Sequence, residues 1–274
     1  MDWKNGVINF FSSATLTNNA TWNITGTNTT SYGDSYGNVV NNGTITKTSI
    51  GFSDFAFVQT FLNNTGATIN CNAGEMRFGG AGNPIFTNAG ALAFNGGMFT
   101  INGGATFHYN TGSSVSGTGT FNNNGVLELN SSVVFPSTMN VTNTIIINGP
   151  GDLTINSDFV IQGQINGPGT LTVNGNTTWI NGLLNRAFVV ENTRTLTINT
   201  ASDKSLKKNL TNNGTIDWQN GAIFFYSVPT ITNTAVWLIS GNNITTTGDN
   251  YAVITNTGTI TKTSSGITDF TYIS

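Results

Sequence analysis

"NNGTITKTS" occupies residues 41–49, and it returns almost unchanged as "NTGTITKTS" at residues 256–264, 215 positions later. Extending the comparison in both directions pairs residues 2–59 with residues 217–274 without a gap, with 30 identities in 58 positions. A chain that repeats so long a stretch is built from repeated structural units. We therefore interpret residues 1–215 as one long repeat unit and residues 216–274 as the start of the next.

A shorter period runs inside this unit. Asn-x-Gly is followed again and again by two apolar residues separated by one polar residue, as in "NNGTITK" at Asn41, "NAGALAF" at Asn88, "NNGVLEL" at Asn123 and "NNGTIDW" at Asn212. Twelve equivalent points from Ala20 to Gly258 divide that stretch into eleven steps, with a mean step of about 22 positions. A period of this size is typical of a coil that stacks on its neighbours.

The alternation of apolar and polar residues indicates how such coils pack. Leu171 and Val173 send their side chains to one face of a short strand, and Thr172 points to the other. One short strand cannot bury its apolar face alone, but stacked coils bury it together. The sequence therefore predicts an all-β, right-handed parallel β-helix (β-solenoid) with about 22 residues per coil, continuous over residues 1–274.

The alternative all-β architecture is a string of immunoglobulin-like sandwiches. It would show strands of varied length and a domain period of ~100 residues. The turn phrase instead recurs at steps of about 18 to 26 positions, with one shorter step of about 14. This regularity favours the solenoid.

Composition restricts the partners. Charged residues make up 8% of the chain and the net charge is −3, so the concentrated positive charge that phosphate binding needs is missing. We expect no nucleic-acid partner, and the absence of a run of about 20 apolar residues argues against membrane insertion. A single cysteine, Cys71, allows no internal disulfide. The chain starts in mid-phrase, since "MDWKNG" matches "IDWQNG" at residues 216–221, and we expect it to be part of a longer protein.

Several phrases resemble those of large bacterial surface proteins. These are "GPGTLTVNG" at residues 167–175, "RTLTIN" at 194–199, "LTNNGTIDWQNG" at 210–221 and "NTGTITKTS" at 256–264. They are similar to the β-helix adhesins of the filamentous-haemagglutinin and autotransporter-passenger type. The resemblance implies an extracellular or cell-surface rod, a non-catalytic structural stalk or adhesive segment without cofactors. Its expected partners are neighbouring repeats of the same chain, surface glycans and, through exposed strand edges, other copies end to end.

One pair of acidic residues occurs twice in the chain. Asp34 and Asp54 lie 20 positions apart, about one coil, and they return as Asp249 and Asp269. Stacked carboxylates suit a cation such as calcium, because they repel each other unless a cation separates them. The competing interpretation is that each aspartate caps a turn. We expect no arginine near either member of the pair, which argues against catalysis.

The other reactive groups are few. Glu75 and Arg77 flank Met76 and are expected to form a solvated ion pair, while His108 is expected to point outward. The phase of Cys71 predicts a small core residue rather than a nucleophile. No catalytic, cofactor-binding or metal-binding residue is assigned on these grounds.

Three further possibilities stay open. Lys204, Lys207 and Lys208 are expected to lie on an exposed corner, where they could also dock an anionic glycan. A β-helix can carry carboxylates and a basic residue on one face, which would suit a polysaccharide-binding or polysaccharide-lyase function. Thr-x-Thr pairs such as Thr170 and Thr172 suggest an ice-binding ladder, but Ala91 and Ala93, and Val126 and Glu128, interrupt it.

Overall fold

The computed structural model describes residues 1–136, 140–143, 146–266 and 268–273. All regular elements in these ranges are strands, and they pair in parallel as a β-solenoid of about 12 turns with about 22 residues per turn. The predicted fold class is therefore confirmed, and the sandwich alternative is wrong, because strands pair from one coil to the next and not within antiparallel layers. The strands form two compact units, residues 1–146 and 147–274, which are described in turn. The repeat boundary at residue 215 and the continuity of one solenoid over the chain stay predictions.

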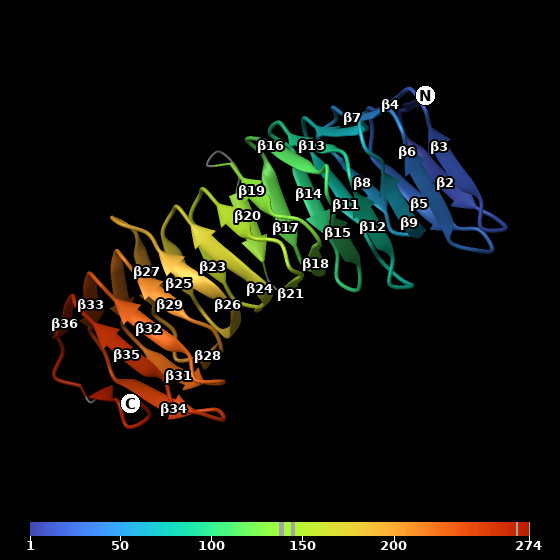
Figure 1. Ribbon diagram of the computed structural model, residues 1–274. Coiled ribbons are helices and arrows are strands. Elements are labelled where there is room, and N and C mark those ends of the chain that lie inside the picture. Colours follow the sequence, from blue (N-terminus) through green and yellow to red (C-terminus); the bar gives the residue numbers. More distant parts are fainter. Residues whose placement is uncertain (137–139, 144–145, 267, 274) are drawn as a thin grey trace. The chain divides into compact units, whose positions relative to one another are not determined.

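The first unit has three faces, each a parallel sheet in which every strand comes from a successive coil (Figure 1). The first face contains β1 (Asp2–Trp3), β4 (Thr21–Ile24), β7 (Thr44–Lys47), β10 (Thr68–Cys71), β13 (Ala91–Phe94) and β16 (Ser114–Gly117). The second contains β2 (Gly6–Phe10), β5 (Asn28–Tyr32), β8 (Phe52–Phe55), β11 (Glu75–Phe78), β14 (Met98–Ile101), β17 (Thr120–Asn123) and β20 (Asn140–Asn143). The third contains β3 (Thr15–Asn18), β6 (Gly37–Asn41), β9 (Val58–Asn63), β12 (Ile85–Asn88), β15 (Thr106–Tyr109) and β18 (Val126–Leu129), and β19 (Val133–Phe135) follows.

The alternation seen in the sequence sets the packing of each face. On the first face, Trp22, Ile45, Ile69 and Leu92 occupy the same register position in four successive coils, and all four are fully buried. Burying one such side chain is worth about 1.5–3 kcal/mol. Columns of this kind, and not isolated strands, hold the solenoid together.

Phenylalanine fills the interior between the second and third faces. The rings of Phe55 and Phe78 stack at 4.9 Å between centroids with planes 4° apart. Phe86 and Phe107, from the third face, stack at 4.8 Å. Because each ring packs on a ring of the next coil, aromatic contacts run from coil to coil through this part of the interior.

A buried ladder of asparagines marks the turn after the third face. The side-chain amide of Asn18 donates to Oδ1 of Asn41 at 2.7 Å, Asn41 to Asn63 at 2.8 Å, and Asn63 to Asn88 at 2.7 Å. Each side-chain amide thus donates a hydrogen bond to the amide oxygen of the next coil, at a buried position. The Asn of the Asn-x-Gly phrase at Asn41 and Asn88 is therefore a core residue of the turn, and Asn18 and Asn63 take the same place in their coils.

The glycine of the same phrase is required by a close approach of the backbone. A Cβ atom on Gly43 would lie 2.0 Å from the carbonyl oxygen of Ala20 in the coil before, and one on Gly258 would lie 2.1 Å from that of Ala235. No side chain fits at such a distance. Coils can stack at this corner because the residue there is glycine.

The second unit begins near β21 (Ile146–Asn148) and has a different arrangement of strands. One sheet contains β23 (Phe159–Ile161), β25 (Thr177–Trp179), β27 (Thr195–Ile198), β30 (Thr215–Trp218), β33 (Val236–Ile239) and β36 (Thr259–Lys262). The other begins with β22 (Leu153–Ile155), β24 (Gln164–Val173) and β26 (Gly182–Val190). The long strand β26 then pairs with two strands of the next coil, β28 (Lys204–Leu206) and β29 (Leu210–Asn212).

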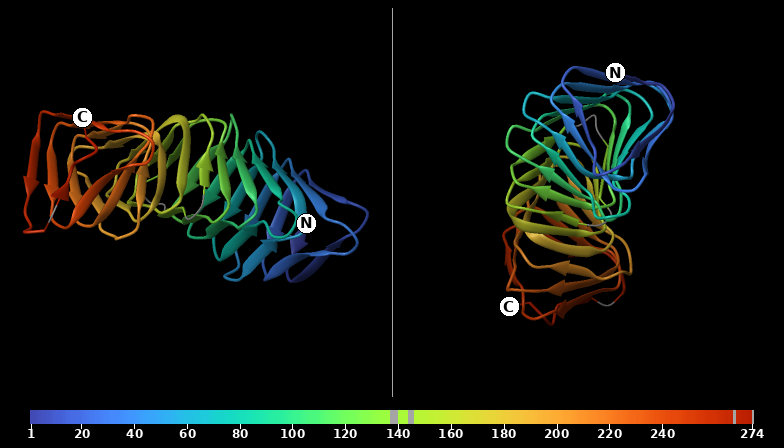
Figure 2. Two further views of the ribbon diagram at one scale, coloured as in Figure 1. Left: turned by 90° about the horizontal axis from the view of Figure 1, so that it is seen from below. Right: turned by 90° about the vertical axis from the view of Figure 1, so that its right-hand side faces the viewer.

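From β26 onward the second unit therefore has three strand columns. One continues from β28 through β31 (Gly221–Phe225) and β34 (Asn243–Thr247) to β37 (Thr268–Asp269), and the other from β29 through β32 (Thr230–Asn233) to β35 (Val253–Asn256). Figure 2 shows the strands of each unit side by side along successive coils. Leu171, Val173, Leu196 and Ile198 are all at most 1% exposed, which confirms their predicted inward phase.

Candidate functional site

The duplicated aspartates at the coil corner cap turns. Oδ1 of Asp34 accepts the backbone N–H of Ser12 at 2.6 Å, and Oδ1 of Asp249 accepts that of Ser227 at 2.8 Å. Ser12 and Ser227 have φ values of 52° and 57°, in the left-handed region that is uncommon for residues other than glycine. The carboxylate of one coil thus stabilises a strained turn in the coil before it.

The proposed stacking of Asp34 on Asp54 is wrong. Asp54 is in register with Thr29 of the preceding coil. Asp34 lies five residues after Thr29, so it does not stack on Asp54. Asp269 accepts hydrogen bonds from the backbone N–H and the hydroxyl of Thr271, which lowers the pKa of its carboxyl group. Within the described ranges, no three His, Cys, Asp or Glu side chains are grouped so that they could hold a metal ion.

A charged cluster occupies the outward side of the second face of the first unit. Arg77 of β11 is in register with Asp54 of β8 and forms a 2.6 Å ion pair with Glu75. Its guanidinium also lies 4.7 Å from the ring centre of Phe52, a cation–π contact. Thr100 donates to the other oxygen of Glu75 at 2.7 Å. The expectation that no arginine would lie near Asp54 is therefore wrong, because Arg77 stacks on it one coil later.

The two carboxyl groups of this cluster are shifted in opposite directions. Burial raises the pKa of Asp54, and the charge of Arg77 offsets this only in part. Burial would also raise the pKa of Glu75, but hydrogen bonds from Arg77 and Thr100 outweigh it, so that this pKa is lowered. Oδ1 of Asp54 is buried and has no hydrogen-bond donor among the described residues. A carboxyl group that holds its proton more readily thus lies beside an ionised carboxylate and an arginine.

Three cationic side chains point into the solenoid, and sequence reasoning did not find them. Lys47, Arg186 and Lys204 are all fully buried, so the expectation that Lys204 lies on an exposed corner is wrong. Their positions follow from strand phase: Lys47 is the next inward residue after Ile45, and Arg186 lies between Leu184 and Phe188 in the same alternation. That phase is the signal that could have identified them.

Backbone carbonyl groups satisfy these buried cations in place of carboxylates. The guanidinium of Arg186 donates to the carbonyl oxygens of Gly149 at 2.7 Å and Asn166 at 2.9 Å, and also to Gly151. Lys204 donates to Ser202 O at 2.7 Å and to both oxygens of Thr200. Burial lowers the pKa of Lys204 to about 8. Arg186 thus links carbonyls of two preceding coils, and Lys204 closes the turn that precedes its own strand.

The phrase "TITKTS" builds the same contact at both of its occurrences. Nζ of Lys47 donates to Oγ of Ser49 at 2.7 Å, and Ser49 donates to the carbonyl of Gly26 at 2.9 Å. Nζ of Lys262 and Oγ of Ser264 repeat this geometry at 3.0 Å and 3.2 Å with the carbonyl of Gly241. The repeated sequence is therefore a repeated corner, closed by a lysine and a serine.

Cys71 and His108 have the orientations predicted for them. Cys71 is fully buried, and burial raises the pKa of its thiol to about 11, so it carries no thiolate at neutral pH. His108 points outward on the third face, in register between Thr87 and Glu128. Cys71 lies on the first face and His108 on the third, so the two side chains belong to different sheets.

The outward threonines do not form a continuous ladder. On the first face of the first unit, one outward register column contains Thr21, Thr44, Thr68, Ala91 and Ser114. The predicted interruption at Ala91 is confirmed. Val126 and Glu128 lie instead on the third face, in register with Thr106 and His108, so they interrupt a different column.

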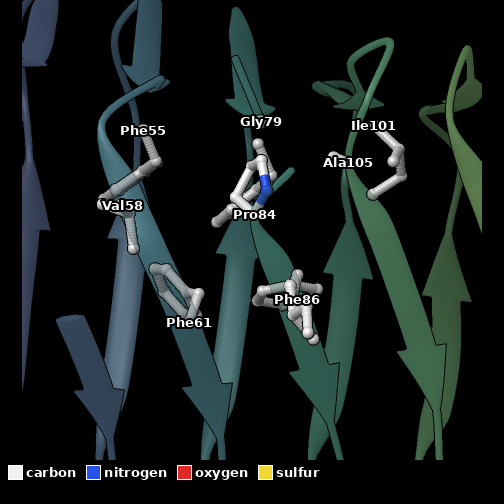
Figure 3. A pocket seen from close by; sticks show the side chains of 10 residues that line it. Phe55, Val58, Phe61, Gly79, Pro84, Phe86, Ile101 and Ala105 are labelled. Carbon is white, nitrogen blue, oxygen red and sulfur yellow. The ribbon is translucent and has the colours of Figure 1, made fainter. Parts of the chain in front are cut away.

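A small cavity between phenylalanine rings of the first unit is apolar and too small for a ligand. Its volume is about 10 Å³, near the smallest space that holds one water molecule, and Phe61, Phe78, Phe86 and Ile101 contribute to its walls (Figure 3). A buried water needs polar partners, which these side chains do not offer. This gap is a packing defect between phenylalanine rings and not a binding site.

Surface grooves occur where coil corners meet. One, of about 280 Å³, lies in the second unit and is lined by Ala187, Lys207, Lys208, Asn209, Ser227, Val228 and Pro229. Another, of about 310 Å³, lies in the first unit and is lined by Ser13, Tyr32, Asp34, Ser35, Tyr36, Asn38 and Gln59. These grooves are large enough to hold part of a small molecule. Lys207 and Lys208 thus face a groove, as docking of an anionic glycan would require, and that docking stays a prediction.

The fold and these sites define the chain as a repetitive parallel β-solenoid. No known protein family, curated protein or solved structure matches it. Over the ranges that the structure describes, no helix has the length and apolar character required to span a bilayer.

Proposed function

We propose that this chain is a structural stalk or adhesive segment of a larger cell-surface repeat protein and that it is not an enzyme. The observation that carries the proposal is the repeated, register-matched corner. The Lys47 contact recurs at Lys262, and the Asp34 cap recurs at Asp249, each one long repeat further along the chain. A solenoid grows by adding coils that contact only their neighbours, so repetition of this kind suits a spacer whose reach is set by coil number.

The surface chemistry supports an exposed location. Outward ladders of asparagine run along several turns: Asn42 donates to Asn19 at 2.7 Å, and Asn64 donates to Asn42 at 2.6 Å. With 8% charged residues, such neutral groups supply most of the surface polarity. Neutral hydrogen bonding depends little on salt concentration, which suits a surface that meets changing media.

The location can be tested with antibodies raised against the chain. They should label intact cells of the source organism, and brief protease treatment of those cells should remove the label. Labelling that requires cell lysis would contradict the proposal.

We expect neighbouring repeats of the same chain, or a second copy, to cover the strand edge of the last coil. Strand β36 pairs with β33 of the coil before it, and the side chain of Ile260 in β36 is 37% exposed. Unpaired edges of this kind favour strand addition. Sedimentation velocity over a range of protein concentrations should show end-to-end association, and a constant sedimentation coefficient would argue against it.

A second candidate function, a polysaccharide lyase, rests on the cluster of Asp54, Glu75 and Arg77. It combines one carboxyl group of raised pKa, one ionised carboxylate and one guanidinium on a single outward face. Proton abstraction next to a uronate carboxylate would need such a set of groups. Incubation with polygalacturonate, followed by ultraviolet absorbance of unsaturated products, tests this function. Activity that Arg77→Gln abolishes and Lys208→Gln leaves intact would favour the lyase over the stalk.

A further inference from the structure

The groove of about 310 Å³ in the first unit is built by three successive coils. Ser13 comes from the turn between β2 and β3, Tyr32, Asp34 and Tyr36 come from the end of β5 and the following turn, and Gln59 comes from β9. Because the coils stack in register, side chains far apart in the sequence form one continuous surface. None of the described residues that line this groove carries a positive charge.

Aromatic rings form the apolar part of the groove. Tyr36 stacks on Phe57 with centroids 6.1 Å apart and planes 20° apart, and its ring lies against Gly82, where an added Cβ would be 3.0 Å from Cζ. The Tyr32 ring meets that of Tyr36 at 5.2 Å and 64°, and Tyr32 is 49% exposed. One ring is thus fixed by its packing, and a second ring beside it is open to solvent.

The turn that carries these rings is held rigidly. Asp34 caps the N–H of Ser12, and Oγ of Ser35 accepts the N–H of Ser13 at 2.5 Å. The amide of Asn38 donates to Ser13 O at 3.4 Å, which links the same two coils again. A binding surface that is ordered before its ligand arrives loses less conformational entropy on binding.

Polar groups with spare hydrogen-bonding capacity surround the rings. Oδ1 of Asp34 is used by Ser12, whereas its Oδ2 has no donor among the described residues. The amide nitrogen of Gln59 donates to Gly82 O at 3.3 Å, and its oxygen is left to accept. The groove therefore combines aromatic faces with acceptors, and it carries one negative charge and no positive one.

From this combination we propose that the groove binds a neutral oligosaccharide, through one or two sugar rings. A pyranose has an apolar C–H face, which packs on an aromatic ring, and a rim of hydroxyl groups, which donate to carboxylate and amide oxygens. The volume of about 310 Å³ lies at the lower end for small-molecule pockets and so fits a short piece of a longer glycan. The charge of Asp34 disfavours anionic glycans. This proposal does not depend on the stalk function.

The chain carries a partial second copy of this site. Gly33, Asp34 and Tyr36 recur as Gly248, Asp249 and Tyr251, and Tyr251 lies 5.8 Å from Tyr272, as Tyr36 lies beside Phe57. Thr247 takes the place of Tyr32. The second copy thus lacks a counterpart of the Tyr32 ring, although Tyr251 is itself 51% exposed, and we expect the first copy to dominate binding.

The test is calorimetric titration of the whole chain with maltohexaose, cellohexaose and mannohexaose as neutral probes and hexagalacturonate as the anionic probe. At least one neutral probe should bind with a Kd of about 1 mM or below. Tyr32→Ala should weaken that binding about tenfold, the upper end for one aromatic contact. Tyr32→Phe, which keeps the ring, should stay within about twofold of the unchanged chain, since it loses at most one exposed hydrogen bond.

Matched controls make the outcome decisive. Ile50→Ala removes a side chain that is 93% exposed at another corner and should leave binding unchanged. Circular dichroism of each variant verifies folding, and Tyr32→Phe provides a comparison in which the packing of the ring is kept. The proposal is overturned if no neutral probe binds at millimolar concentration, if hexagalacturonate binds more tightly than all neutral probes, or if Tyr32→Ala binds as the unchanged chain does.

Discussion

Replacing Asn63 by leucine removes the middle of the buried asparagine ladder while keeping the branching and the number of heavy atoms of the side chain. Asn63 is 1% exposed; it accepts from Asn41 at 2.8 Å and donates to Asn88 at 2.7 Å. Asn41 keeps two other acceptors, the carbonyl oxygens of Gly43 and Thr68. Oδ1 of Asn88, in contrast, loses the one donor it has among the described residues.

The expected cost follows from these contacts. The two short hydrogen bonds, with Asn41 and Asn88, contribute about 1 kcal/mol each, and a third, from Asn63 to Ala91 O, is long at 3.4 Å and adds little. A buried acceptor without a donor costs a further ~1–3 kcal/mol. The added apolar burial of leucine returns about 1 kcal/mol. Asn63→Leu should therefore lower the free energy of unfolding by about 3 kcal/mol, measured by urea denaturation monitored with circular dichroism.

The neighbouring residue provides the matched control. Asn64 makes the same kind of amide hydrogen bond, to Asn42 at 2.6 Å, but on the solvent side of the turn. Asn64→Leu should cost less than about 1 kcal/mol, because water replaces the lost partner. If the two variants are equally destabilised, or if Asn63→Leu costs less than its neighbour, the ladder does not act through burial.

Three further outcomes are expected. The pKa of Lys204 is about 8 in the folded chain and 10.5 when unfolded. The buried charge therefore lowers the free energy of unfolding by its full amount below pH 8, and this loss declines as the pH rises toward 10.5. Relative to Lys204→Met, the free energy of unfolding of the unchanged chain should thus rise by about 2–3 kcal/mol between pH 8 and 10, and parallel pH profiles would contradict this. Cys71, buried with a pKa of about 11, should react with a thiol reagent only after unfolding; labelling of the folded chain at the rate of an accessible thiol would be inconsistent with its burial. Asp34→Ala should lower stability by about 1 kcal/mol through loss of the Ser12 cap, while Asp34→Asn, which keeps the acceptor oxygen, should lose less, and equal losses would show that charge and not the cap matters.

The inward phase of the strands is readable from the sequence, and it predicts more buried residues than the apolar ones alone. Leu171 and Val173 were predicted to be buried, and they are. The same alternation places Lys47, Arg186 and Lys204 inside, where charged residues are rarely found. For Lys204, strand phase predicts a buried side chain, whereas the general preference of lysine for the surface predicts an exposed one. What the sequence did not reveal was the set of backbone carbonyls that satisfy these cations.

The charged cluster shows why stacking partners could not be assigned beforehand. Asp54 was paired with Asp34 because their separation in the sequence is close to the mean coil. In the structure Asp54 instead stacks between Thr29 of the coil before and Arg77 of the coil after. Coil length varies with the turn at each corner, and an error of a few residues changes the partner completely. A mean period predicts that coils stack, but it does not predict which side chains meet.

The sequence by itself determined the fold class, the coil length and the burial of the alternating apolar residues, because these depend on local alternation and on a repeated turn that is rich in Asn and Gly. The tertiary structure alone decided which residues lie beside each other in different coils. The pairing of Asp54 with Arg77 and the groove of Tyr32, Asp34 and Gln59 arise from the register between coils. That register is set by the summed packing of the whole interior, which no single stretch of the chain contains.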